Sequence, residues 1–144
     1  LCQKLDLSCG IDYLLDMIGK NETSTFALGS RVQYIKTGLK PFNSFTIRKW
    51  RESGSKTEYD KLKEAVDHDS LRPNLTMHVY CDKTTDEILS IGIARTNDIV
   101  RYIEEGRAYE KETGDEQIGH SKFWVVDWDA FKNYTNTCYT YTRS

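Results

Sequence analysis

Three histidines and a set of glutamates are the residues best suited to acid–base chemistry. The histidines are His68, His78 and His120. A histidine and a carboxylate in hydrogen-bond reach can act as general acid and base. Secreted ribonucleases use such a pair on small disulfide-linked α+β scaffolds. No motif fixes the spacing here, so a small secreted hydrolase of nuclease type is the alternative hypothesis. The candidate carboxylates are Glu104, Glu105, Glu110, Glu112 and Glu116.

Motifs for metals, nucleophiles and cofactors are weak or absent in the sequence. His78 and Cys81 have the spacing H-x-x-C, but residues three apart on a strand point to opposite faces and cannot share an ion. There is no G-x-S-x-G motif, no G-x-G-x-x-G motif and no P-loop. We therefore expect no catalytic residue, no metal site and no cofactor.

Cysteines and glycosylation triplets indicate the cellular location in which the protein is expected to function. The chain has four cysteines, an even number that allows three pairings, and their spacing matches no metal site. We prefer Cys81–Cys138 together with Cys2–Cys9. Three N-x-S/T triplets begin at Asn21, Asn74 and Asn133. These features predict a secreted protein or the extracellular side of a membrane protein. With no initiator methionine or signal-peptide pattern, we expect a processed mature form or an excised ectodomain.

Composition narrows the possible partners. The chain has 144 residues and a net charge of −2, with basic and acidic residues well mixed. This argues against nucleic acid, because phosphate binding needs a concentrated basic face. No apolar run approaches the roughly 20 residues of a membrane span, so we expect no membrane insertion. The length fits a single domain over residues 1–144.

Hydrophobic periodicity predicts the elements that would position these residues. Ile11, Leu14, Leu15 and Ile18 recur at helical spacing, so a helix is expected from Ser8 to Gly19. Residues 26–50 predict strands forming a hairpin or a strand-loop-strand unit, and residues 57–68 a helix that Thr57 could cap. Residues 74–81 and 87–95 predict a hairpin, and a helix capped by Thr96 or Asn97 follows. The charged tract from 110 to 117 is expected to be a loop or a frayed helix end. Residues 121–128 and 138–142 predict strands around a glycosylated connection.

The predicted fold class is α+β. We expect a β-rich single domain centred on an antiparallel sheet, with two or three short helices and linked by disulfides. In the strand at 74–81, Leu75, Met77, Val79 and Cys81 are expected to face the core. A lipocalin-type carrier is less favoured, because the G-x-W signature is absent and two helical segments interrupt the strands.

Aromatic and basic residues are left as candidates for recognition. Trp, Tyr and Arg anchor protein interfaces more often than other residues. The leading hypothesis is therefore a non-enzymatic extracellular glycoprotein that binds another extracellular protein. A host-interaction or immune-modulating protein of a virus or parasite fits this profile, as does a host cell-surface domain. The predicted partner-binding residues are Trp50, Arg48, Arg51, Trp124, Trp128, Tyr139 and Tyr141.

Overall fold

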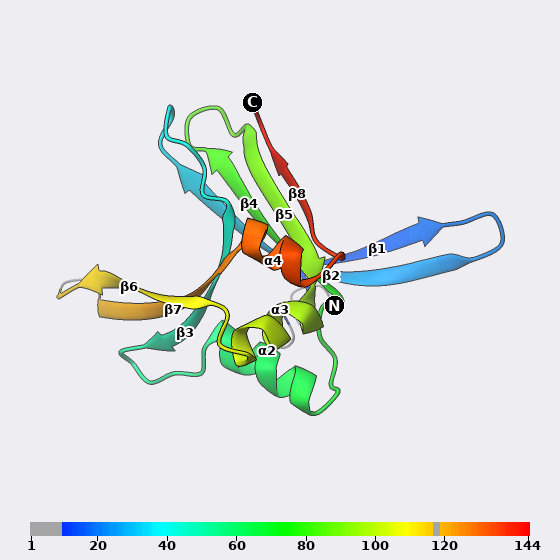
Figure 1. The fold of residues 1–144 in the computed structure, drawn as a ribbon, viewed down its shortest axis with the longest axis horizontal. Helices are drawn as coiled ribbons and strands as arrows, with labels where there is room; N and C mark the ends of the chain where they lie inside the picture. Colours follow the sequence, from blue (N-terminus) through cyan, green and yellow to red (C-terminus); the bar gives the residue numbers. More distant parts are fainter. Residues whose placement is uncertain (1–9, 117–118) are drawn as a thin grey trace.

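The fold consists of two β-sheets and helices packed between and beside them (Figure 1). The structure is a computed structural model that describes residues 10–116 and 119–144. The five-stranded sheet has the order β1-β2-β4-β5-β8, and the three-stranded sheet has the order β3-β7-β6. The strands of the five-stranded sheet are β1 (Tyr13–Ile18), β2 (Thr23–Ile35), β4 (Leu75–Asp82), β5 (Ile88–Arg95) and β8 (Tyr139–Thr142). The strands of the three-stranded sheet are β3 (Ser44–Arg51), β6 (Tyr109–Asp115) and β7 (Gly119–Asp127). The helices are α2 (Glu58–Asp67), α3 (Thr96–Glu104) and α4 (Trp128–Tyr134).

The described part of the chain confirms the α+β class and corrects the sheet type. It is rich in strand and contains three helices. The β4–β5 hairpin is confirmed, with Met77 opposite Ile93 and Val79 opposite Ile91. However, β2 and β4 pair in parallel, so the five-stranded sheet is mixed rather than antiparallel. Of the two arrangements expected for residues 26–50, the strand-loop-strand unit is confirmed and the hairpin is wrong, because β2 and β3 belong to different sheets.

The predicted N-terminal helix is wrong over its described residues. Residues 13–18 form β1, which pairs antiparallel with β2 in a hairpin that projects from the body as an arm (Figure 1). The turn closes where the Gly19 N–H donates to the Glu22 carbonyl at 2.7 Å. Tyr13, Leu14 and Ile18 are exposed, so the helical spacing of apolar residues reflects no buried helix face. The predicted cap, Ser8, lies outside the described residues.

The helix α2 begins as predicted. Thr57 forms a capping box with Asp60, in which each side chain accepts a hydrogen bond from the other residue's backbone N–H. The helix α3 is also confirmed, and it buries Ile99, Tyr102 and Ile103. Its N-cap is Arg95 without a side-chain hydrogen bond, so the predicted cap at Thr96 or Asn97 is wrong. Thr96 instead shares a buried hydroxyl contact of 2.8 Å with Thr76.

Two segments predicted as connections are regular elements. Residues 128–134 form α4, whose N-cap Asp127 accepts a hydrogen bond from the Ala130 N–H at 2.9 Å. The charged tract forms β6, in which Lys111 lies opposite Phe123 and Glu112 opposite Lys122 of β7. Glu110 on this strand pairs with Lys49 at 2.5 Å. The charges therefore belong to a strand whose acidic face is neutralised by its neighbours.

The core lies between the sheets and the helices, on the face of β4 that the sequence assigned to the outside. Thr76, His78 and Tyr80 of β4 are buried on the side facing β3 and the helices, here called the inner face. Leu75, Met77, Val79 and Cys81 lie on the opposite, outer face, where Val79 and Cys81 are buried and Leu75 and Met77 are half-buried. None of the four belongs to the main core cluster, so that cluster does not pack on the face that the sequence predicted. Polar side chains can face inward here because the core supplies partners for them.

A glycine in β5 allows the closest packing in the core. The indole ring of Trp128 lies directly on Gly92, where an added Cβ would be 2.1 Å from the Cε2 atom of Trp128. Trp128 also contacts the rings of Phe45 and Phe131, with centroids 6.0 and 5.9 Å apart. The core cluster includes Phe45, Ile47, Ala94, Ile99, Tyr102, Ile103, Val126, Trp128 and Phe131.

The predicted disulfide between Cys81 and Cys138 is not present. Both thiols are free. Cys81 lies opposite Ile88, at one end of β5, whereas Cys138 directly precedes Tyr139, which lies opposite Ile93 near the other end. The five-residue offset along β5 corresponds to roughly 17 Å, far beyond the reach of a disulfide. Cys2 and Cys9 lie outside the described residues.

Within the described ranges, no helix is long and apolar enough to span a membrane.

Candidate functional site

The structure separates the seven predicted contact residues into four places. Arg48 and Arg51 lie on β3 beside Glu58, and Trp50 and Trp124 lie on the other face of the three-stranded sheet. Trp128 is in the core, and Tyr139 and Tyr141 lie on β8. They therefore do not form one surface, and each place has to be assessed separately.

Trp128 is a core residue rather than a contact residue. Its relative exposure is 2%, because α4 presses its ring against Gly92 of β5. The sequence predicted a strand over residues 121–128, which would end at Trp128. The chain instead enters a helix at this position, and the helix turns the side chain into the core.

Trp50 and Trp124 are covered by lysines from their own sheet. The Lys49 Nζ atom lies 3.8 Å from the centroid of the Trp124 ring, and the Lys122 Nζ atom lies 5.8 Å from the centroid of the Trp50 ring. Both lysines also pair with Glu110, at 2.5 and 3.6 Å. These internal contacts already use much of the surface that the two tryptophans would offer to a partner.

Tyr139 and Tyr141 lie on the outer face of the five-stranded sheet, together with aliphatic residues from its other strands. One row across the sheet consists of Val32, Val79, Ile91 and Tyr141. The next row consists of Ser30, Met77, Ile93 and Tyr139. Residues opposite one another in neighbouring strands point to the same face. Six exposed or half-exposed residues of this surface are here called the tyrosine face: Val32, Tyr34, Ile91, Ile93, Tyr139 and Tyr141.

The tyrosine face is open and uncharged. Tyr139 is 63% exposed, Tyr34 is 55% exposed and Tyr141 is 45% exposed. Neither of the two rows contains a charged side chain. The ion pair between Arg143 Nη1 and Glu87 Oε2, at 2.6 Å, involves the residues that directly follow β8 and precede β5. The strand pairing that brings Val32 and Tyr34 into one sheet with β8 cannot be read from local sequence.

The three histidines lie in three separate environments. His68 is the C-cap residue of α2, and His120 lies 3.4 Å from the Glu112 carboxylate on an exposed strand pair. His78 is fully buried, and burial followed by the nearby charge of Arg31 lowers its pKa to about 3. The Thr46 N–H donates to His78 Nδ1 at 3.4 Å, and the ring stacks on Tyr80 with centroids 4.4 Å apart. No cleft brings two of these histidines to one carboxylate in the described structure, so the geometry gives the hydrolase hypothesis no support.

The residues suited to metal binding are not gathered together. In the part of the chain that the structure describes, no three His, Cys, Asp or Glu side chains are placed to hold one ion. His78 lies on the inner face of β4 and Cys81 on its outer face, so this pair does not converge. Burial raises the pKa of both thiols, that of Cys138 to about 11, which keeps each protonated and weakly nucleophilic.

The three triplet asparagines lie at the surface. Asn21 is in the β1–β2 turn, Asn74 directly precedes β4, and Asn133 is in the last turn of α4, and all three are exposed. The Asn74 Oδ1 atom accepts a hydrogen bond from the Ala27 N–H at 2.8 Å. None of the three belongs to the tyrosine face.

No protein-family model, curated protein or solved structure matches the chain.

Proposed function

We propose that the chain is a non-enzymatic recognition module that binds another protein through the tyrosine face. The observation that supports this most is the pair of uncharged rows that end in Tyr141 and Tyr139. Contiguous apolar surface rimmed by polar residues marks interaction sites in soluble proteins. Tyrosine adds hydrogen-bonding tips to an apolar body, which is why it is enriched in protein interfaces.

The chemistry of the face restricts the partner. A polyanion would need cations on the rows themselves, and the rows have none. The side chains stand up from a sheet, so the complementary surface is a broad, uncharged protein surface rather than a deep pocket. We expect the partner to offer apolar side chains to Val32 and Ile91, and hydrogen-bond acceptors to the tyrosine hydroxyls.

An extracellular location remains part of this proposal, supported by the three exposed triplet asparagines. The cysteines that are described give it no support, because Cys81 and Cys138 are free. If the chain is secreted from cells that glycosylate their exports, its mass should fall on removal of N-glycans. An unchanged mass would contradict the location while leaving the tyrosine face unaffected.

The binding proposal is tested by comparing two sets of tyrosine substitutions. A photoreactive residue at position 141 of the full chain would identify the partner by cross-linking. The double variant Tyr139→Ser/Tyr141→Ser should then weaken binding at least tenfold, since buried aromatic anchors typically contribute about 2 kcal/mol or more each. The matched control is Tyr13→Ser, which removes an equally exposed tyrosine from the β1–β2 arm.

Three results would contradict the proposal. Unchanged binding by the double variant would exclude the tyrosine face, and an equal loss in the control would show a nonspecific effect. Concentration-dependent self-association that the double variant abolishes, measured by analytical ultracentrifugation, would assign the face to a second copy of this chain.

A further inference from the structure

A basic cleft opens between the two sheets, on the side of β2 and β4 away from the tyrosine face. One cavity of about 500 Å³ is lined by residues of β2, β3 and α2, and an adjoining cavity of about 250 Å³ by residues of β2, β6 and β7. Arg31 and Thr46 line both cavities. The residues that define this inter-sheet cleft are Arg31, Thr46, Arg48, Glu58 and Phe123.

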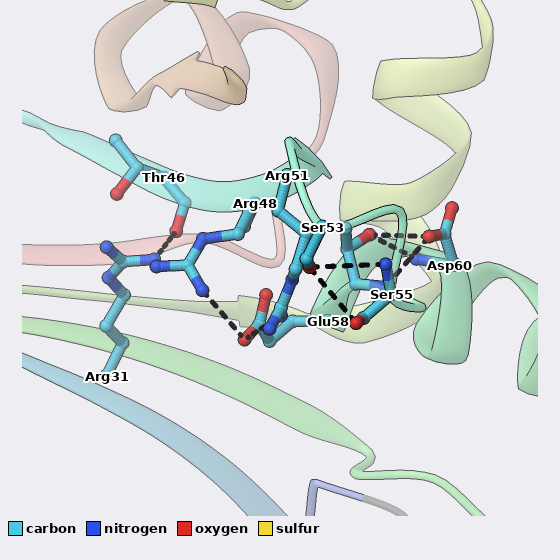
Figure 2. A network of polar contacts seen from close by, with 9 residues as sticks. Arg31, Thr46, Arg48, Arg51, Ser53, Ser55, Glu58 and Asp60 are labelled. Carbon is cyan, nitrogen blue, oxygen red and sulfur yellow. Dashed lines mark hydrogen bonds and ion pairs between the residues drawn. The ribbon is translucent and has the colours of Figure 1, made fainter. Parts of the chain in front are cut away.

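Arg31 extends from β2 into the cleft with most of its hydrogen-bonding capacity unused. Its Nη1 atom donates to the Thr46 carbonyl at 3.2 Å (Figure 2). A guanidinium has five N–H donors, and no carboxylate among residues 10–116 and 119–144 lies within ion-pair distance of this one. Burial and the neighbouring Arg48 both lower the pKa of Arg31. The charge of Glu58 acts on Arg31 in the opposite direction but does not pair with it. A half-buried cation without an ion-pair partner costs free energy that a bound anion would recover.

Arg48 brings a second guanidinium to the same place. The Cζ atoms of Arg31 and Arg48 each lie 5.4 Å from the centroid of the Phe123 ring, so one aromatic ring holds two like charges near each other. Figure 2 shows the two guanidinium groups directed toward the same space between β2 and β3. The Nε atom of Arg48 is buried and has no partner among the described residues.

The charges around the cleft do not balance. Glu58 Oε1 is shared between Arg48 at 3.7 Å and Arg51 at 3.1 Å. The residues that line the two cavities carry four positive charges (Arg31, Arg48, Lys61 and Lys111) and two negative charges (Asp12 and Glu58), which leaves two positive charges. Asp12 also accepts a hydrogen bond from the Ser30 N–H. A dianion would neutralise this excess, whereas a single carboxylate would leave one charge.

The smaller cavity has a different chemistry, because aromatic rings line it. Phe42, Tyr80, Tyr109 and Phe123 are among its lining residues. The Phe42 and Tyr80 rings lie 6.0 Å apart, and Lys111 covers the Phe42 ring at 5.5 Å. Tyr109 is 58% exposed, so its ring offers a face on which a planar ring can stack.

We propose that the inter-sheet cleft binds a small phosphate monoester carried on a planar ring, of the size of a nucleoside monophosphate. The phosphate lies between Arg31 and Arg48, whose planar N–H groups match its oxygens. The ring enters the compartment of Tyr80, Tyr109 and Phe123. A cleft of this volume is typical of small-ligand sites. This site is independent of the tyrosine face, which lies on the opposite side of the sheet.

Calorimetric titration of the full chain tests the proposal with four probes: inorganic phosphate, adenosine monophosphate, adenosine and a single-stranded oligonucleotide. Adenosine monophosphate should bind more tightly than either phosphate or adenosine, because it occupies both compartments. If neither phosphate nor adenosine monophosphate binds, the proposal is wrong. Tighter binding of the oligonucleotide, compared per site, would replace the small-molecule ligand with a nucleic acid.

Substitutions show which cavity of the cleft binds the phosphate and which binds the planar ring. Arg31→Gln should weaken binding of adenosine monophosphate at least tenfold, whereas Arg143→Gln, an exposed arginine outside the cleft, should leave binding unchanged. Tyr109→Ser should weaken binding of adenosine monophosphate severalfold and leave binding of phosphate unaffected.

If Arg31→Gln fails to fold, Glu58→Gln is informative instead, because removing the competing carboxylate should tighten binding. Unchanged affinity in Arg31→Gln, or a weakening in Glu58→Gln, would overturn the phosphate site, and equal effects of Tyr109→Ser on both probes would overturn the ring site.

Discussion

At the scale of single residues, His78 is a titratable side chain placed where it cannot take up a proton without cost. It is fully buried, stacks on Tyr80 and accepts a hydrogen bond from the Thr46 N–H. Burial and the positive charge of Arg31 lower its pKa from 6.5 to about 3. The folded protein therefore holds this ring neutral at any pH above about 3.

This pKa predicts an acid-sensitive stability. Between pH 6.5 and pH 3 the unfolded state binds a proton at His78 that the folded state does not, so stability falls as the pH falls. From this group alone we expect a loss of about 2 kcal/mol between pH 7 and pH 5. Urea unfolding across this range measures the loss.

Two substitutions separate this effect from general acid sensitivity. His78→Gln keeps a hydrogen-bond acceptor for Thr46 but does not titrate, so its stability should depend less on pH. The control is His68→Gln at the exposed end of α2, which should retain the full dependence. An identical pH dependence in His78→Gln and the unsubstituted protein would contradict the assignment.

At the scale of elements, the start of α2 positions a residue of the cleft. Thr57 is buried, and its capping box with Asp60 fixes the first turn, where Glu58 pairs with Arg48 and Arg51. Thr57→Ala should lower the free energy of unfolding by about 1 kcal/mol, the usual cost of losing a cap. Thr57→Ser retains the hydroxyl and should lose much less. The prediction is wrong if the two variants are equally destabilised in urea.

Local sequence predicted the elements whose side chains agree with their surroundings. The capping residues before α2 and the apolar stripe of α3, including Ile99 and Ile103, depend only on neighbours in the sequence. The β4–β5 hairpin was also predictable, because two apolar runs flank a short polar turn. These elements would look similar in many folds.

The elements that were mispredicted depend on distant partners. The stripe containing Leu14 and Ile18 suggested a helix, but hydrogen bonding to Thr23–Leu28 makes a strand there. The acidic tract becomes β6 because Lys49 and Lys122, from the other two strands of its sheet, neutralise Glu110. The inner face of β4 is polar because other elements supply partners to Thr76 and His78.

The same reasoning applies to the candidate sites. Tyr139 and Tyr141 were identified from residue type, and Arg48 was noted for its charge, but the surfaces that contain them arise from strand pairing. Arg31 was not singled out, because one arginine in an alternating strand has no local signal. Its role follows from facing Arg48 and Phe123 across the cleft.

At the scale of the whole molecule, the oxidation state of the cysteines is a test of the fold and of the proposed extracellular location. Cys81 is buried and Cys138 partly buried, and both are free. Alkylation in denaturant, followed by mass spectrometry, should find both residues modified without prior reduction. In the native state both should react slowly, because burial hinders access and raises their pKa values. A cross-linked peptide that joins Cys81 to Cys138 would contradict the fold, since it requires a different register of β8.

The strands of the two sheets alternate along the sequence, and this limits which fragments of the chain can contain one complete sheet. The five-stranded sheet takes its strands from residues 13–35, 75–95 and 139–142, and the three-stranded sheet takes its strands from residues 44–51 and 109–127. The shortest fragment that includes the whole second sheet therefore also includes β4 and β5, and any fragment with the whole first sheet includes everything between. Internal deletions would disrupt both binding surfaces at once, so the tyrosine face and the cleft can be distinguished only by point substitutions or by truncation of β8, which contributes no residue to the cleft.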